Sequence, residues 1–301
     1  MIHHQQSHPL VIPNGAFGRE KSACRLPQET RAPDNHRMPK SDWQRRIQRA
    51  QELIEQHAVA AEMLGFYVHL ARLQEQLHRD LERGIEKPTP ISAGSISEHD
   101  LRTLASKFGA YLSVVEKHGP KLLSRLARDL QTPGKNNWAE LLQDAWRVRR
   151  PCGAQEFLVQ AFLQPYAELL RSRISLPAAE SRYAICPFCQ RKPSVGVLRP
   201  MGEGAARSLV CGFCAVEWNF RRLVCPGCGE ENDKNLLVFT ASDFDYIRVE
   251  GCETCKTYIK TIDLTKNGHG EPLVDELASA SLDVWAREQG YAKLQPNLLG
   301  M

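Results

Sequence analysis

The sequence predicts a multi-domain α+β protein with an N-terminal all-α helical bundle, two tandem rubredoxin-like or zinc-ribbon β modules, and a C-terminal helix. Three observations predict this class. Residues 41–173 carry a helical pattern throughout, eight of the ten cysteines form four C-x-x-C pairs between Cys186 and Cys255, and residues 271–290 return to a helical pattern. We expect five units: 1–39, a flexible or irregular extension; 40–180, the helical domain; 181–223 and 224–268, the first and second four-cysteine metal modules; 269–301, the C-terminal helix and tail.

Composition bounds the class of protein before any motif is considered. The chain has 301 residues, 42% of them hydrophobic and 25% charged, which is ordinary for a globular protein with a substantial core. A net charge of +4 is weak for a nucleic-acid binder, so we expect no nucleic-acid partner. The longest apolar stretch, "AVAAEMLGFYVHLARL", is interrupted by Glu62 and His69, and Leu10–Ile12 is too short for a signal core. We therefore expect a cytoplasmic protein with no membrane insertion.

The helical pattern starts at Ser41, after an extension rich in Pro, His, Asn and Gly. Apolar residues at steps of three and four predict a helix that stops near Gly84. "SEHD" at 97–100 resembles a capping box with Asp in place of Glu, and its helix should end before Gly119-Pro120. Pro165 predicts a kink or break in the last helix. The result is a bundle of five or six helices.

The cysteine pairs repeat at a nearly constant offset, which indicates an internal duplication. The first and third pairs are 39 positions apart and the second and fourth are 41 apart, so the motif C-x2-C-x21–23-C-x2-C occurs twice. Two such turns brought together by a hairpin place four thiolates around one metal ion. We predict two sites with these ligands: Cys186, Cys189, Cys211 and Cys214 in the first, and Cys225, Cys228, Cys252 and Cys255 in the second. Crossed pairing of the pairs and redox dithiols are the alternatives.

The four cysteine pairs differ in the residues that favour a metal-binding turn, and their thiolates suit more than one metal. "CPGCG" has the proline and the glycine that favour a metal-binding knuckle, "CPFCQ" has only the proline, and "CGFCA" and "CETCK" lack the full set. Four thiolates suit zinc or a single iron equally, with an Fe–S cluster as a further alternative. Six bases could offset the thiolate charge: Lys192, Arg199, Arg221, Arg222, Lys256 and Lys260.

The last predicted element is a helix over residues 271–290. Pro272 suits its first turn, acidic residues cluster early, and Gly290 is a plausible C-cap. No Ser/His/Asp set, glycine-rich phosphate loop or pair of catalytic carboxylates stands out in the chain, so we predict no catalytic residues and a protein that is not an enzyme.

Four stretches together resemble the formate dehydrogenase accessory proteins of the FdhE family. They are "YAICPFCQRKPSVG", "LVCGFCAVEWNFRRLVCPGCGE", "GCETCKTYIKTIDL" and "VDELASASLDVWAREQGYAK". The matching elements are the four cysteine pairs, Glu217-Trp218, Arg222, Tyr258 and Lys260. The resemblance covers roughly residues 183–295, and the helical part matches only in general character.

The resemblance implies an assembly factor with rubredoxin-like iron centres, one mononuclear iron in each of two sites, and zinc as the alternative metal. It implies binding to the catalytic subunit of a respiratory formate dehydrogenase in the cytoplasm before twin-arginine export; a homodimer is left open. Tyr258 and Lys260 share one strand face and are the expected docking contact, whereas Trp218 either packs between the modules or docks. The alternative functions are a rubredoxin-type electron carrier and, less favoured, a zinc-ribbon nucleic-acid binder.

Overall fold

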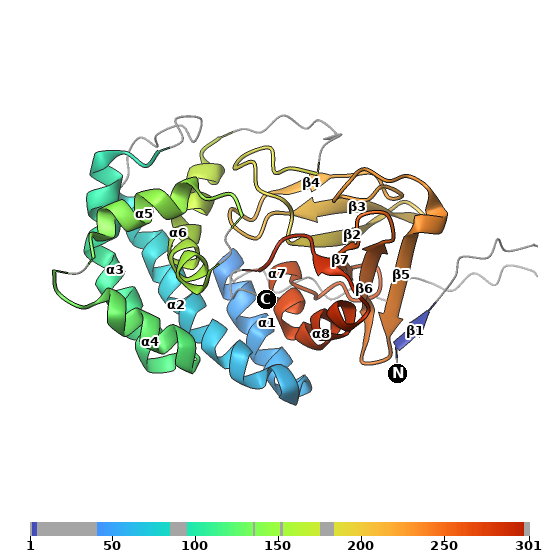
Figure 1. Cartoon of the computed structure of the whole chain (residues 1–301), viewed down its shortest axis with the longest axis horizontal. Helices are drawn as coiled ribbons and strands as arrows, with labels where there is room; N and C mark the ends of the chain where they lie inside the picture. The colour runs from blue at the N-terminus through green and yellow to red at the C-terminus, as the bar shows by residue number, and fades with distance from the viewer. Residues whose placement is uncertain are drawn as a thin grey trace, which may run out of the picture.

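The computed structural model describes residues 2–4, 41–84, 95–134, 136–150, 153–174 and 184–297. A bundle of helices is followed by a sheet with two further helices packed on it, which confirms the predicted fold class (Figure 1). In the described part of the chain the bundle has six α-helices: α1 (Asp42–Gln56), α2 (Ala61–Gly84), α3 (Glu98–His118), α4 (Lys121–Leu130), α5 (Trp138–Arg147) and α6 (Ala154–Ser172). A 3-10 turn, η1 (Ala58–Ala60), joins α1 to α2.

The predicted extension at 1–39 lies outside the described residues, apart from strand β1 (Ile2–His4). This strand pairs with β5 (Leu236–Ala241) at the edge of the sheet. Residues 2–4 therefore pair with a strand of the second cysteine module, although the two segments are far apart in sequence. The predicted unit boundaries at 180/181, 223/224 and 268/269 stay predictions.

The ends of α2 and α3 follow the sequence signals. Helix α2 ends at Gly84, and α3 ends at His118, directly before a Gly-Pro pair. At the start of α3 the Ser97 hydroxyl accepts a hydrogen bond from the Asp100 amide at 3.1 Å. The Asp100 carboxylate does not act in the predicted capping box, because it accepts a hydrogen bond from the Tyr166 hydroxyl at 2.8 Å. This buried contact fastens α3 to α6.

Helix α6 runs through Pro165 without the predicted break. A proline at this position has no amide to donate to the carbonyl four residues earlier, that of Ala161. The side chain of Gln74 on α2 supplies the missing hydrogen bond, because its Nε2 donates to the Ala161 carbonyl at 2.6 Å. The neighbouring helix therefore compensates for the proline, and α6 stays continuous in the core.

Six of the eight strands of the sheet form two copies of one three-stranded unit. In the first copy the hairpin of β2 (Val195–Met201) and β3 (Gly204–Val210) is followed by β4 (Glu217–Asn219). In the second copy the hairpin of β5 and β6 (Phe244–Cys252) is followed by β7 (Thr257–Asp263). Each hairpin connects the two cysteine pairs of its module, so the duplication seen in the sequence has the same strand order in both copies.

The two units form a single sheet with the strand order β1-β5-β6-β7-β2-β3-β4. Strands β7 and β2 pair in parallel across the join, with Val195 opposite Lys260 and Leu198 opposite Asp263. Gly196 is needed there, because a Cβ at this position would collide with the Thr261 side chain. A short strand, β8 (Ala292–Lys293), also pairs with β7. The modules thus share backbone hydrogen bonds.

The single helix predicted for residues 271–290 is wrong, because two helices occupy this segment. Helix α7 (Pro272–Ala278) and helix α8 (Ala280–Glu288) meet at Ser279, whose ψ angle is 34°. The Ser279 hydroxyl bonds the carbonyl of Asp275 at 2.9 Å, and the Lys260 ammonium bonds the carbonyl of Glu276 at 2.5 Å. The Asp275 carbonyl keeps its helical hydrogen bond from the Ser279 amide, whereas Lys260 takes the Glu276 carbonyl, which the Ala280 amide would use in a continuous helix. Pro272 in the first turn and the positive φ of Gly290 agree with the prediction.

One hydrophobic core runs from the helical bundle into the first cysteine module. It contains bundle residues such as Phe108, Tyr111 and Phe162 together with Phe213, Trp218 and the four cysteines of the first module. A second core lies between the sheet and α8, and a third joins α1 and α2 to α7. In Figure 1, α7 lies beside α1, next to the sheet. The bundle and the sheet half therefore stabilise one another.

A buried ion pair adds to this contact. The Arg49 guanidinium on α1 donates to the Asp275 carboxylate on α7 at 2.6 Å, and the Tyr246 hydroxyl on β6 donates to the same carboxylate at 2.7 Å. The three side chains come from three elements, and the residues themselves are at least 29 positions apart in sequence. They fix α1 against the sheet half.

Candidate metal centres

All four C-x-x-C loops have the same backbone geometry. In each loop the carbonyl of the first cysteine accepts a hydrogen bond, at 2.8–3.0 Å, from the amide four residues later. The residues that donate these amides all have positive φ angles, between 52° and 81°: Gln190, Ala215, Gly229 and Lys256. The knuckle predicted in full only for "CPGCG" therefore forms four times.

Three of these loops adopt the left-handed conformation without glycine. A non-glycine residue in this region costs roughly 1–2 kcal/mol, because its Cβ approaches the following carbonyl oxygen. The loops at Gln190, Ala215 and Lys256 tolerate this strain because the hydrogen bond and the clustered cysteines hold each turn closed. The presence of proline and glycine therefore predicts too few knuckles, because the surrounding fold also selects the conformation of each turn.

The first cluster brings together the four cysteines predicted from spacing. Its Sγ atoms lie 3.5 Å apart for Cys186 and Cys214, 3.4 Å for Cys189 and Cys211, and 3.6 Å for Cys189 and Cys214. Four sulfurs at ~2.3 Å from one ion would be ~3.8 Å apart in a regular tetrahedron. The spacing needs only a small expansion to hold an ion, so the residues fit a tetrathiolate metal site.

The second cluster has the same arrangement with the remaining four cysteines. Cys225 and Cys255 are separated by 3.7 Å between Sγ atoms, and Cys228 and Cys252 by 3.8 Å. In each cluster the four ligand atoms lie within 4.8 Å of one another. The eight cysteines are free thiols grouped as first-with-second and third-with-fourth pairs, not in the crossed arrangement.

The thiols of both clusters need a cation before they can all ionise. Burial raises the pKa of Cys211 and of Cys214, and it raises the pKa of Cys225 to about 12. Burial also acts to raise the pKa of Cys255, but hydrogen bonds from Thr257 lower it to about 7. Since a metal binds thiolates, an ion held by these cysteines would displace their protons and would supply the missing positive charge.

The two clusters differ in exposure. Every cysteine of the first cluster is at most 1% exposed, and all four belong to the core that continues into the bundle. In the second cluster Cys228 is exposed and Cys255 is partly exposed, whereas Cys225 and Cys252 are buried. A solute can therefore reach the second cluster in the folded protein, but not the first.

The helical bundle covers the first cluster through an arginine that sequence reasoning missed. The Arg191 guanidinium lies 3.7 Å above the Phe213 ring and donates to the carbonyls of Trp146 and Val148 at the end of α5. Its charge also helps to lower the pKa of Cys189, after the larger effect of the neighbouring thiols of that cluster. The sequence offered one signal for this role, which is that Arg191 comes directly after the first knuckle. In the structure the Arg191 carbonyl accepts a hydrogen bond from the Cys186 amide.

The six bases expected to offset the thiolate charge have mostly other roles. Four of them bond carboxylates instead: Arg199, Arg221, Lys256 and Lys260. Such pairs reduce the positive charge that each base can offer to a cluster. The mixed-sign surface around the modules is thus organised as ion pairs.

Glu230 holds the two knuckles of the second cluster together, a role that sequence reasoning missed. Its carbonyl accepts from the Cys225 amide at 2.9 Å, and its carboxylate accepts from the Thr254 hydroxyl in the facing knuckle at 2.5 Å. The Asn235 side chain donates to it at 3.0 Å. The hydrogen bond from Thr254, followed by those of the Asn232 amide and Asn235, lowers the pKa of Glu230 to about 2. The carboxylate is therefore ionised at neutral pH.

Tyr258 and Lys260, expected to form a docking contact, are buried, so that expectation is wrong. Tyr258 is 3% exposed and Lys260 is fully buried. The Tyr258 hydroxyl donates to Asp283 at 2.7 Å, and the Lys260 ammonium contacts Asp283 at 2.7 Å and Glu276 at 3.1 Å. The strand face they share is covered by α7 and α8. Trp218 is also buried, in the core shared with the bundle.

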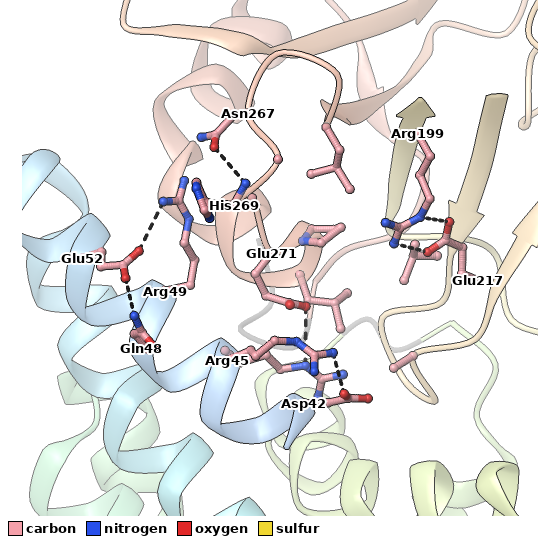
Figure 2. A pocket seen from close by; sticks show the side chains of 18 of the residues that line it. Asp42, Arg45, Gln48, Arg49, Glu52, Arg199, Glu217, Asn267, His269 and Glu271 are labelled. Carbon is pink, nitrogen blue, oxygen red and sulfur yellow. Dashed lines mark hydrogen bonds and ion pairs between the residues drawn. The ribbon is translucent and has the colours of Figure 1, made fainter. Parts of the chain in front are cut away.

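A charged cleft lies between α1, the sheet and the loop at residues 264–271 (Figure 2). Its volume is about 960 Å³. Four arginines each face a carboxylate at 2.5–3.8 Å: Arg45 with Asp42, Arg46 with Glu271, Arg49 with Glu52, and Arg199 with Glu217. Burial raises the pKa of Glu271, but Arg46 beside it acts in the opposite direction. The charges of the walls balance, so the cleft does not select for a ligand of one sign.

Comparison with known proteins gives one family. The profile described as "FdhE, central domain" matches residues 185–222, and that described as "FdhE, C-terminal domain" matches residues 224–299. A relative called Protein FdhE homolog from Aquifex aeolicus (strain VF5) is 30% identical over 224 residues, which cover 74% of this chain and 78% of the relative. One of the same name from Haemophilus influenzae (strain PittEE) is 26% identical over 272 residues, or 85% and 87% of the two chains.

A solved structure has the same fold. The crystal structure of the FdhE protein from Pseudomonas aeruginosa superposes with a TM-score of 0.61 at 24% sequence identity. The superposition covers 86% of this chain and 96% of that one. It therefore includes the helical part, where the sequence resemblance was only general. In the described residues no helix is long and apolar enough to cross a membrane.

Proposed function

Because the chain belongs to the FdhE family, we propose that it is a formate dehydrogenase accessory protein that acts during assembly of that enzyme. In this proposal it binds the catalytic subunit of a respiratory formate dehydrogenase in the cytoplasm, before twin-arginine export, and is not itself a catalyst. The observation that carries the proposal is the pair of four-cysteine clusters, of which one lies in the segment matched by each FdhE profile.

We propose further that each cluster holds one mononuclear iron ion, with zinc as the alternative. Cys186, Cys189, Cys211 and Cys214 would hold one ion, and Cys225, Cys228, Cys252 and Cys255 the other. The tetrathiolate donor set and the sulfur spacing support a single ion in each site. Such an ion would crosslink the two knuckles of its module, and iron would in addition allow exchange of one electron.

A rubredoxin-type electron carrier is the second candidate, and the exposure of Cys228 favours it. An exposed thiolate would bring the metal within reach of a redox partner. This function predicts a reversible one-electron potential and turnover with a reductase, neither of which assembly of a client requires. Voltammetry of the iron-loaded protein separates the two candidates.

The experiment that tests the proposed function is co-purification of the catalytic subunit with this protein. Untagged metal-loaded protein and a tagged formate dehydrogenase catalytic subunit are expressed together, and metal content and the absorption spectrum are measured on the captured complex. We expect stoichiometric capture and a tetrathiolate spectrum. A folded, metal-loaded protein that captures none of the catalytic subunit would remove the assignment.

A further inference from the structure

A small groove opens beside the second cluster, on the sheet face opposite α8. We call it the Leu223 groove; its cavity has a volume of about 110 Å³. The lining residues that contribute to its charge and its apolar surface include Arg207, Arg222, Leu223, Leu236, Val238 and Glu250. Cys225 and Cys252, one from each knuckle of the second cluster, also line it. The cluster therefore forms part of the groove wall.

The groove collects exposed apolar side chains. Leu223 is 66% exposed and Val238 is 36% exposed, and Leu236 between them is partly buried. Seven large apolar side chains are exposed in the described part of the chain, and two of them line this one hollow. Exposed apolar residues that stand alone are ordinary, whereas here two of them share one hollow.

The groove also carries one positive charge, that of Arg222, which no carboxylate of the described residues neutralises. The Arg207 side chain is 2% exposed and bonds Glu250 at 2.5 Å, but its Nε has no hydrogen-bond partner in the described residues. Arg222 at the rim is exposed and contacts only a backbone carbonyl, at 3.5 Å, among the described residues. Glu250 is the one carboxylate among the lining residues. In this the groove differs from the cleft of Figure 2, whose arginines each face an acid.

We propose that the Leu223 groove binds an extended segment of the catalytic subunit in which an aliphatic side chain stands beside a carboxylate. This inference rests on the proposed function. A cavity of ~150 Å³ lined by apolar residues accepts a benzene ring, so a groove of about 110 Å³ holds one branched aliphatic side chain. The neighbouring carboxylate meets Arg222, with Arg207 beneath it. A nucleic acid offers no branched aliphatic side chain for the hollow.

Two double variants test the surface. Arg222→Glu with Leu223→Ser changes the groove, and Arg125→Glu with Leu122→Ser makes the same exchange on α4, where Leu122 is 67% exposed and Arg125 is exposed. Metal content and the unfolding midpoint should stay unchanged in both, because all four side chains are exposed. We expect the groove variant to capture at least tenfold less catalytic subunit and the α4 variant to capture as much as the unchanged protein.

The outcomes separate this inference from the proposed function. If the unchanged protein captures the catalytic subunit and the groove variant captures it equally well, the groove inference is overturned and the function stands. If the unchanged protein captures none, both are removed. If the groove variant instead changes the oligomeric state in sedimentation, a second copy occupies the groove and the inference is likewise overturned.

An array of overlapping peptides from the catalytic subunit tests the recognised chemistry. Peptides that bind the unchanged protein but not the groove variant should contain an aliphatic residue next to Asp or Glu. Replacing that acid by its amide should abolish the difference. Binding peptides that lack this pair of residues would refute the chemistry assigned to the groove.

Discussion

Replacing Lys260 by methionine removes one charge from a buried network of four. The ammonium groups of Lys260 and Lys293 lie between the carboxylates of Glu276 and Asp283, at N–O distances of up to 3.1 Å. All four residues come from the segment after the last cysteine pair and join β7 and β8 to the two C-terminal helices. Methionine has a similar length and no charge, so the change leaves two carboxylates facing one ammonium.

The expected loss of stability is large. Breaking a buried ion pair by removal of one partner costs roughly 3–5 kcal/mol, because the remaining charge is left uncompensated in a buried site. The freed carbonyls of Glu276 and Ser279, which Lys260 bonds at 2.5 and 3.3 Å, add to the loss. Against a typical total of about 5–15 kcal/mol, this change removes a major part of the free energy of unfolding.

The contribution of Glu276 to the pH dependence of the free energy of unfolding should change sign in this variant. Burial acts to raise the pKa of Glu276, but Lys260 and Lys293 lower it to about 2. In the unchanged protein this carboxylate therefore stabilises the fold above its unfolded pKa, and that contribution is lost as the pH falls towards 2. Without Lys260 the effect of burial is less opposed, so the pKa of Glu276 rises and protonation favours the folded state. The variant should gain stability, relative to the unchanged protein, as the pH falls from 7 to 5.

Urea unfolding of metal-loaded protein at pH 7 and pH 5 measures these effects. Adding Asp283→Asn to Lys260→Met restores charge balance and should recover part of the stability at pH 7. Lys234→Met, at an exposed lysine, is the control and should change the free energy by less than about 0.5 kcal/mol. An unchanged midpoint for Lys260→Met, or a double variant less stable than the single one, would refute the network.

Two further predictions concern the cysteine clusters. With zinc in both sites, a chelator should remove one equivalent of zinc at least tenfold faster than the other, because Cys228 is exposed and the first cluster is not. Cys228→Ser should abolish only the fast phase of zinc removal. Loss of both equivalents in one phase would contradict the assignment. Gln190→Gly should raise the free energy of unfolding by about 0.5–1 kcal/mol, because relief of the left-handed strain exceeds the entropy cost of glycine. Gly229→Ala should lower the free energy of unfolding by a similar amount, because it introduces that strain. Equal midpoints in chemical denaturation would argue against strained knuckles.

The cysteine clusters could be predicted from the sequence because their information is local. A C-x-x-C pair fixes two ligands within one turn, and the repeated offset shows which turns meet. Helix ends were readable for the same reason, as at Gly84 and before the Gly-Pro pair that follows α3. Where the deciding partner lies within a few residues, spacing and turn chemistry are sufficient.

The environment of Tyr258 and Lys260 could not be predicted in this way. Their alternation on a strand shows that they share a face, but the helices that cover this face lie 12 or more residues further along the chain. A lysine is normally exposed, so burial beside Glu276 and Asp283 runs against its usual behaviour. Likewise, nothing near Pro165 predicts that Gln74, far away on α2, supplies the hydrogen bond that the proline lacks.

The duplication places one kind of module in two different environments. Both copies have the same strands and knuckles, and they differ in what covers them. The first copy packs its cysteines into the core of the helical bundle through Phe213 and Arg191, so loss of its metal would disturb the bundle as well. The second copy exposes Cys228 and contributes Cys225 and Cys252 to the Leu223 groove. If the second copy holds the proposed ion, loss of that ion should deform the groove while the shared core stays packed, and binding of the proposed client should fail before the fold does.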